Sequence, residues 1–378
     1  MAMKELLEIL DAIDKFAKEG QQMALATIIG VRGSTYRREG ARLLCTQRQQ
    51  MVGNISGGCL ESDVMVVSEE VMRTGRPRMV TYDLTADDDA VWGLGLGCNG
   101  AVDLFVEPAD PASPVLPLLR DAITNEQSLG LITVVDGPAP LGAWMAVYAD
   151  SRRVGSLGEG ALDERAHRAA HAVLEEGTSR VQSLPAANGD VKVFIEAIRP
   201  PVRLVVCGAG HDAIPVVNVA SMLGWRVVVV DQRERYLTHE RFPGAREFIK
   251  AEPALAAASV PIDSRTYVVV MTHNYMHDRD LLRGFLHTDA PYVGMLGPKM
   301  RTEKIISELR GVGVPVTDRD RGRIFGPVGL DLGGEGPEEI ALAVVGEILA
   351  VEGGRRAGFL RERPGPIHAE TKPSTIVR

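Results

Sequence analysis

The sequence predicts an α/β protein in which an N-terminal α/β domain is followed by a Rossmann-like domain with a doubly wound parallel sheet. In the second half, short apolar runs alternate with longer segments of helical periodicity, a pattern typical of parallel sheets. Between the halves, Pro200 and Pro201 interrupt both patterns, because proline donates no backbone hydrogen bond and disfavours helix at the preceding residue. We therefore predict domains at residues 1–199 and 202–352, with a mobile tail at 353–378.

Composition excludes several classes of protein. Of the 378 residues, 45% are hydrophobic and 24% are charged, so a large core is expected. The net charge of −8 makes general binding to nucleic-acid phosphates unfavourable. Aromatic residues are too few for stacking on single-stranded nucleic acid. The sequence shows no secretion signal and no apolar run long enough to span a membrane. Its four cysteines are therefore expected to be reduced thiols in the cytoplasm.

The N-terminal half mixes helical periodicity with short strand-like runs. Apolar residues recur every three or four positions in three predicted helices, at 3–19, 61–74 and 162–176. Glycine ends the first two, at Gly20 and Gly75. Strands are expected at 23–29, 43–46, 51–52, 101–106, 129–136, 143–148 and 191–198, and a proline-marked loop at 108–117. No internal repeat is evident.

The C-terminal half alternates regularly. Strands are expected at 203–207, 226–230, 247–249, 267–271 and 292–295, and helices at 212–223, 278–286, 299–309 and 337–351. The first strand runs into Gly208-Ala209-Gly210 and then a helix, which predicts a tight turn with free amides at the helix N-terminus for a phosphate. Asp231 follows Gly210 at the spacing of a ribose-binding acid. The alternative is a turn that serves only packing.

Polar residues follow the strand that ends at Met271. His273, His277, Asp278 and Asp280 would lie at the carboxyl edge of the sheet, where ligands bind in such folds. The spacing of the two histidines also suits a metal pair. Because the segment contains no H-E-x-x-H motif and is expected to be a loop, a hydrogen-bonding or ligand-lining role is the favoured interpretation.

Two features of the first domain suit an anion and a soft metal. Arg32, Arg37, Arg38 and Arg42 lie among glycines, which predicts an anion site rather than only a solvated basic loop. Cys59 follows Ser56-Gly57-Gly58 and precedes a helix, whose N-terminus would lower the pKa of the thiol. Cys98 lies in a second glycine-rich segment. Cys45 and Cys207 lie in predicted strands and are expected to be buried.

Taken together, these motifs resemble the XdhC/CoxI family of accessory proteins, which mature xanthine dehydrogenase and related molybdenum hydroxylases. The motifs that carry the resemblance are Gly33-Ser34-Thr35-Tyr36 with Gly40, Ser56-Gly57-Gly58-Cys59-Leu60-Glu61, Gly97-Cys98-Asn99-Gly100, Gly208-Ala209-Gly210-His211, Asp231-Gln232-Arg233, Thr272-His273 with Asp278, 292–297, 329–333 and 337–341. Asn99 departs from the family, in which a second glycine usually follows the cysteine.

The resemblance implies a chaperone that binds molybdenum cofactor (a molybdopterin), protects its sulfurated form and delivers it to an apo hydroxylase. It also implies a homodimer and contact with a cysteine desulfurase. The expected cofactor-binding residues are Arg37, Arg38, Arg42, Ser56, Gly57, Gly58, Cys59, Glu61, Cys98, Gly208, Gly210, His211, Asp231, His273 and Asp278. Cys59 and Cys98 are the candidates for contact with molybdenum, a thiophilic metal.

Two alternatives stay open. An NAD(P)-dependent oxidoreductase would explain the glycine turn and Asp231 but would leave the glycine–cysteine segments of the first domain without a role. A sulfur relay would use Cys59 and Cys98 as persulfide carriers. The sequence favours an accessory protein over an enzyme, and it predicts no catalytic residue.

Overall fold

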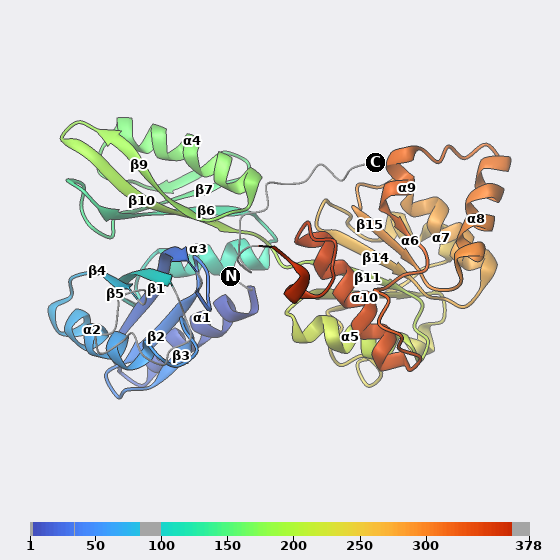
Figure 1. The fold of residues 1–378 in the computed structure, drawn as a ribbon, viewed down its shortest axis with the longest axis horizontal. Coiled ribbons are helices and arrows are strands. Elements are labelled where there is room, and N and C mark those ends of the chain that lie inside the picture. Colours follow the sequence, from blue (N-terminus) through green and yellow to red (C-terminus); the bar gives the residue numbers. More distant parts are fainter. Residues whose placement is uncertain (1–2, 34, 84–99, 365–378) are drawn as a thin grey trace. The chain divides into compact units, whose positions relative to one another are not determined.

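The computed structural model describes residues 3–33, 35–83 and 100–364, which form two compact units that meet in sequence at Pro200 and Pro201 (Figure 1). The predicted fold class is confirmed. The N-terminal unit combines helices with antiparallel sheets, and the C-terminal unit contains a parallel sheet. None of the helices in the described ranges has the length and apolar composition needed to cross a lipid bilayer.

The N-terminal unit contains two five-stranded antiparallel sheets with the orders β3-β2-β1-β5-β4 (sheet A) and β8-β7-β6-β10-β9 (sheet B). The first half comprises α1 (Met3–Lys18), β1 (Met23–Gly33), β2 (Arg42–Thr46), β3 (Met51–Gly53), α2 (Glu61–Thr74), β4 (Arg78–Asp83) and β5 (Gly100–Pro108). The second comprises α3 (Val115–Thr124), β6 (Leu129–Asp136), β7 (Trp144–Tyr148), β8 (Arg153–Gly155), α4 (Gly160–Glu176), β9 (Arg180–Ala186) and β10 (Gly189–Ile198).

These two halves are copies of one topology. Each has a helix, three strands, a helix and two strands, and the two sheet orders are the same when the strands are renumbered. The register agrees as well, because Leu25 pairs with Glu107 in sheet A as Leu131 pairs with Glu196 in sheet B. Each first strand also has a one-residue bulge at the same position. The prediction that the chain has no internal repeat was therefore wrong.

The repeats pack through their inner faces. Helix α2 covers the outer face of sheet A, and α4 covers the outer face of sheet B (Figure 1). Between the sheets lies a cluster to which the repeats contribute equivalent residues, namely Ile29 and Phe105 from one and Val135 and Phe194 from the other. Helices α1 and α3 close the rest of the inner layer with leucine and isoleucine side chains.

One buried ion pair joins the repeats. Arg42 at the start of β2 donates to both carboxylate oxygens of Glu196 on β10, at 2.8 and 2.5 Å, and both side chains are 5% exposed. Burial of a charge is costly unless a partner in good geometry compensates it, and the two-pronged arginine–carboxylate contact provides such geometry. The pair therefore fixes how sheet A meets sheet B.

The structure adds elements that the sequence pattern did not predict. Helix α3 occupies part of the predicted loop 108–117. Pro117 is its third residue and so lies in the first turn, where backbone N–H groups have no partner within the helix. A proline there therefore costs no hydrogen bond. Strands β4, β8 and β9 also escaped prediction. They lie at or next to the sheet edges and are half-exposed, so they lack a continuous apolar run.

The C-terminal unit has the strand order of a doubly wound sheet, β13-β12-β11-β14-β15-β16, with all neighbours parallel. Its strands are β11 (Arg203–Cys207), β12 (Arg226–Asp231), β13 (Glu247–Lys250), β14 (Thr266–Val270), β15 (Tyr292–Met295) and β16 (Ile324–Phe325). Its main helices are α5 (Ala213–Met222), α7 (Tyr275–Phe285), α8 (Lys299–Gly311) and α10 (Pro337–Glu352). Helices α5 and α10 cover one face, and α7 and α8 cover the other.

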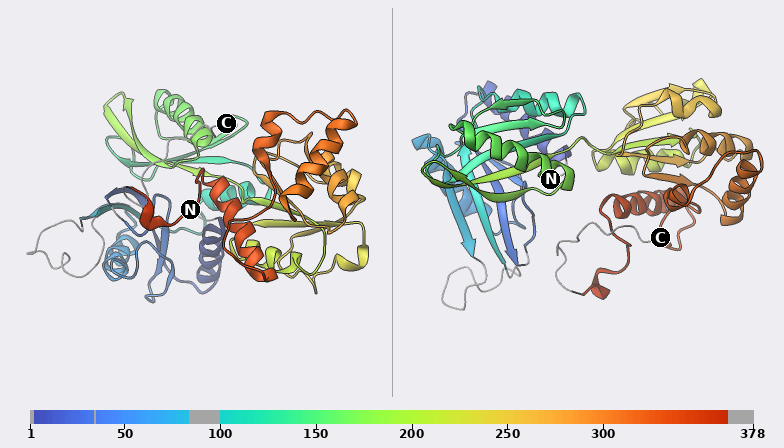
Figure 2. Two further views of the ribbon diagram at one scale, coloured as in Figure 1. Left: turned by 45° about the vertical axis from the view of Figure 1, so that its right-hand side comes forward. Right: turned by 90° about the horizontal axis from the view of Figure 1, so that it is seen from above.

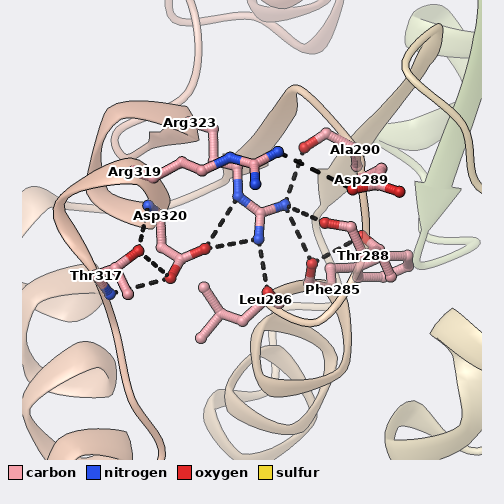
Figure 3. A network of polar contacts seen from close by, with 9 residues as sticks. All are labelled: Phe285, Leu286, Thr288, Asp289, Ala290, Thr317, Arg319, Asp320 and Arg323. Carbon is pink, nitrogen blue, oxygen red and sulfur yellow. Dashed lines mark hydrogen bonds and ion pairs between the residues drawn. The ribbon is translucent and has the colours of Figure 1, made fainter.

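A buried arginine fixes the carboxyl end of α7 (Figure 3). Arg323, at the end of the unpredicted helix α9 (Asp318–Arg323), donates to the carbonyls of Leu286 at 2.7 Å and of Thr288 and Ala290 at 2.9 Å. Its guanidinium also binds Asp320 at 2.8 Å. These contacts satisfy a carbonyl at the end of α7 and two carbonyls of the segment that follows it. The other end of α7 reaches the edge of the sheet at which ligands bind in this fold.

Removal of one partner of the Arg42–Glu196 pair should destabilise the protein strongly. We expect Arg42→Met or Glu196→Leu alone to lower the free energy of unfolding by about 3–5 kcal/mol, since each leaves an unpaired buried charge. The double variant should recover most of that loss. Urea unfolding followed by circular dichroism measures all three, and additive losses in the double variant would contradict this account.

Candidate functional site

One end of sheet A gathers the segments that the sequence singled out. Gly33 at the end of β1 pairs with Gly100 at the start of β5, and Asp83 at the end of β4 pairs with Ala101. The ribbon shows these strand ends together at one end of the sheet (Figure 2). The arginine-containing loop and the segment 84–99 therefore both leave the sheet here. Cys98, which precedes Gly100 by two positions, lies outside the described residues, as do Ser34 and Asn99. The acidic run Asp87 to Asp89, for which the sequence favours a solvated loop over a metal site, also lies outside them.

The N-terminus of α2 lies over the same end of the sheet. Burial raises the pKa of Tyr82, near the end of β4, to about 12. The nearby Asp63 carboxylate, in the first turn of α2, contributes to this shift to a smaller extent. Cys59 lies just before this helix, is partly exposed and packs on the apolar cluster beneath α2. The structure thus places the Cys59 thiol near the point from which the arginine loop and the segment carrying Cys98 emerge.

A compact cap holds the turn that presents Cys59. The Ser56 hydroxyl accepts hydrogen bonds from the amides of Gly58 and Cys59 at 3.1 Å and of Leu60 at 3.2 Å. It donates to the Glu61 carboxylate, which also accepts from the Ser56 amide at 3.0 Å. Burial alone would raise the pKa of Glu61, but the hydrogen bonds from Ser56 and nearby amides lower it overall. Ser56 and Glu61 therefore position the turn and the thiol that it carries.

The predicted arginine cluster is divided in the structure. Arg37 pairs with Glu5 of α1, and Arg38 lies 3.5 Å from Glu39. Arg42 is not in the loop at all: its guanidinium is buried against Glu196, which explains its presence without any ligand. No sequence pattern indicates this pairing, because Glu196 is distant in the chain.

The second repeat lacks the features that distinguish this end of sheet A. The position equivalent to Cys59 is Ala161, and β9 and β10 are joined by the two residues between Ala186 and Gly189, where the first repeat inserts residues 84–99. The hairpin is also longer in the first repeat, where 14 residues separate the paired Thr27 and Arg42, against 10 between the equivalent Thr133 and Trp144. What differs between two copies of one fold is not required by the fold, so these additions make this end of the first repeat the candidate functional site.

The glycine turn of the C-terminal unit has the predicted geometry. Gly208 has φ +117°, and a Cβ there would lie 2.6 Å from the Met271 carbonyl oxygen, so the position requires glycine. A Cβ on Gly210 would meet nothing within 4 Å. Helix α5 follows without a side-chain cap, and the exposed His211 lies beside it. The start of α5 is therefore open to an anion.

Both carboxylate oxygens of Asp231 accept hydrogen bonds from within the protein. One carboxylate oxygen accepts from the Ala209 amide at 2.7 Å, and both oxygens accept from the side chain of Arg233 at 2.8 and 2.9 Å. Burial would raise its pKa, but these hydrogen bonds lower it overall. Arg233 in turn stacks on Tyr236. Asp231 thus locks the glycine turn and orients an arginine toward the adjacent pocket.

That pocket has a volume of about 250 Å³ and lies at the carboxyl ends of β11, β12 and β14. It is lined by Gly208, Val230, Asp231, Gln232, Arg233, Ala251, Pro253, Ala256, Thr272, Asn274, His277 and Leu281. The structure brings together Gly208, Asp231 and His277 here, as the sequence suggested. Arg233, Thr272 and Asn274 were not among the predicted site residues, since their types alone carry no specific signal.

The segment after β14 begins a helix earlier than predicted. Asn274 caps α7 by accepting from the amides of Met276 at 3.0 Å and His277 at 3.2 Å, so His277 and Asp280 are helical. His273, with φ +58°, lies 3.0 Å from Asp212, and Asp278 is buried against Thr272 and Arg301. Within the described ranges, no group of three or more histidine, cysteine or acidic residues is placed to hold a metal ion.

Comparison with known proteins gives matches along most of the chain. The family model described as the XdhC Rossmann domain matches residues 204–348, and that of the XdhC and CoxI family matches 16–83 and 122–185, one segment in each repeat. A crystal structure from Bacillus halodurans described as a xanthine dehydrogenase is 30% identical, covers 94% of this chain and 98% of its own, and superposes with a TM-score of 0.76.

Two curated proteins are also similar. A Bacillus subtilis protein described as a probable xanthine dehydrogenase subunit is 29% identical over 89% of this chain and 95% of its own length. The molybdenum cofactor insertion chaperone PaoD of Escherichia coli is 21% identical over 88% of this chain and 84% of its own length.

The cap at Ser56 can be tested against its counterpart in the second repeat, Ser156, which donates to Asp163 at 2.7 Å. We expect Ser56→Ala to lower the free energy of unfolding by about 1 kcal/mol and to speed alkylation of Cys59, because the turn loosens. Ser156→Ala should also destabilise but leave Cys59 unchanged. Mass spectrometry in a Cys98→Ser background follows the alkylation, and equal rates in both variants would contradict the role of Ser56.

The stability that this cap contributes should depend on pH. Because the pKa of Glu61 is lowered in the folded chain, its contribution to stability is present above its unfolded pKa of about 4.3 and is lost as the pH falls through the folded value. The difference in unfolding free energy between the wild type and Glu61→Gln should therefore shrink between pH 6 and pH 3.5. Urea titrations at each pH measure it, and a constant difference would contradict the assignment.

The glycine turn provides a matched pair of substitutions. Gly208→Ala should lower the free energy of unfolding by roughly 1–3 kcal/mol, because the added Cβ meets the Met271 carbonyl at a left-handed backbone position. Gly210→Ala should cost much less, since the added methyl group meets only open space. Chemical denaturation compares the two, and equal losses would show that the turn is not constrained as described.

Proposed function

Because the chain belongs to the XdhC and CoxI family, we propose that it is an accessory protein that binds molybdenum cofactor as cargo and inserts it into an apo hydroxylase of the xanthine dehydrogenase type. The name of PaoD, a molybdenum cofactor insertion chaperone, supports this role, as does the name of the Bacillus subtilis relative. Protection of the sulfurated form of the cofactor during transfer is part of the proposal.

The observation that carries the proposal is the contrast between the two repeats. The first repeat alone has Cys59, the arginine-containing loop and the insertion between β4 and β5 that carries Cys98. Cys59 and the strand ends that flank the loop and the insertion lie at one end of sheet A. The cargo contains a thiophilic metal, for which a partly exposed thiolate is a suitable ligand. We therefore assign Cys59, with Cys98, to contact with molybdenum.

Around the thiol, the surrounding residues have supporting roles. The exposed Gly57 and Gly58 allow a ligand to approach the backbone closely, and Ser56 and Glu61 keep their turn in place. Arg37 and Arg38 are the remaining loop cations for an anionic group of the cargo.

The glycine turn of the C-terminal unit is proposed to bind a phosphate. The groups that would contact it are Gly208, Gly210, His211 and the start of α5. His273 and Asp278 would support the adjacent loop. The alternative, an NAD(P)-dependent oxidoreductase, would normally use the acid at the end of the second strand to accept the ribose hydroxyls. Both oxygens of Asp231 already accept from Ala209 and Arg233, which weighs against that mode of binding.

The proposal predicts that Cys59→Ser weakens binding of purified molybdenum cofactor at least about tenfold, because a hydroxyl is a poor ligand for a thiophilic metal. Cys45→Ala is the matched control, since that thiol is fully buried in β2 and burial raises its pKa. Binding is measured by co-elution of molybdenum and pterin with the protein. Equal retention by both variants would remove Cys59 from the model.

A second measurement separates a chaperone from a permanent component of the enzyme. The loaded protein, mixed with an apo hydroxylase, should restore hydroxylase activity and then elute separately from it. A stable stoichiometric complex with the mature enzyme would contradict the role of a chaperone and favour that of a permanent component. Reduction of NAD(P) coupled to a carbonyl substrate would favour the oxidoreductase.

A further inference from the structure

The N-terminal unit contains a cavity of about 170 Å³ between its two repeats. Helix α1 contributes Leu6, Ile9, Leu10 and Ile13, and α3 contributes Val115, Leu116 and Leu119. The sheets contribute Leu25, Arg42, Glu107, Leu131, Thr133 and Trp144. An apolar cavity of about 150 Å³ is large enough to bind benzene, so this space suits a molecule built on one six-membered ring.

The repeat explains why the polar side of the cavity is incomplete. Glu107 on β5 and Glu196 on β10 occupy equivalent positions, opposite Leu25 and Leu131. Arg42 and Trp144 are also equivalent, since they pair with Thr27 and Thr133 on the first strands of their sheets. Arg42 of the first repeat neutralises Glu196 of the second. The reciprocal partner of Glu107 would be residue 144, where the chain has tryptophan instead of a cation.

Glu107 consequently borders the cavity without a counter-ion of its own. No hydrogen bond to its carboxyl is made from within residues 3–33, 35–83 and 100–364. Burial raises the pKa of Glu107 to about 7, partly opposed by Arg42 and reinforced by Glu196. These are the charged groups that face it from β2 and β10, and α1 and α3 present only apolar side chains to the cavity. Asp110, in the segment between β5 and α3, also lines the cavity, and its carboxylate accepts a hydrogen bond from the Ala112 amide at 2.9 Å.

We propose that this cavity binds a small molecule with one ring and a cationic or forked N–H group, such as an amidine or an aminopyridine, which donates to Glu107. The ring takes the apolar space between α1, α3 and Trp144, and the N–H group supplies the cation that the second repeat lacks. The ligand site is separate from Cys59 and does not depend on the proposed function.

Titration of the full chain with benzamidine tests the proposal, with benzoate and toluene as ligands that keep the ring and change the charge. We expect saturable binding of benzamidine with a dissociation constant below about 1 mM, weaker binding of toluene and none of benzoate. Binding of benzamidine should strengthen about tenfold from pH 6 to pH 8, because Glu107 ionises over that range. Equal affinities for benzamidine and benzoate would overturn the proposal.

Three variants and one control locate the binding. Glu107→Gln should remove both the preference for the cation and the dependence on pH, and Leu10→Phe should abolish binding by filling the space. Trp144→Arg should supply the missing cation and also abolish binding, whereas Val181→Arg, which adds the same charge on the exposed face of β9, should not. Circular dichroism verifies folding. Retention of benzamidine binding in folded Leu10→Phe and Trp144→Arg would show that the ligand binds elsewhere and would refute the site.

Discussion

A buried contact, the ion pair between Arg42 and Glu196, gives the packing of the two N-terminal repeats its specific geometry. Two sheets with apolar inner faces could slide against each other, since dispersion forces and apolar burial have little directionality. A two-pronged guanidinium–carboxylate contact has one favourable geometry, and its desolvation makes any other arrangement costly. The pair therefore sets how closely the repeats approach each other. That approach positions α1 and α3, the space that they enclose with the sheets and the end of the loop before β2.

The repeat also separates what folding requires from what function adds. Core positions such as Ile29 and Val135 are filled in both copies by residues of similar size, so packing restricts them equally. The end of sheet A is free of this constraint, because loops tolerate insertions at a small entropic cost. One copy could therefore acquire a thiol and long loops while the other kept the unit stable.

The sequence predicted the C-terminal unit more fully than the N-terminal unit. Buried parallel strands are uninterrupted apolar runs, and the backbone at Gly208 demands glycine, so both leave a direct trace in the residues. The turn at Cys59 was found for a similar reason, since Ser56 and Glu61 act over a few positions. Contacts between distant residues leave no such trace. Arg42 was consequently predicted to belong to an anion-binding loop, and the repeat went unnoticed because its two copies share register and shape rather than residues.

Arg323 has a consequence for how the C-terminal unit opens. A single guanidinium holds the last carbonyls of α7, the turn that follows and Asp320 of α9, segments that are otherwise separate in the chain. None of them can detach while the others keep their contacts, so they should exchange their amide hydrogens as one cooperative block. The pocket lies at the opposite end of α7 from this block, so ligand access would rely on local movement of the residues between β14 and α7.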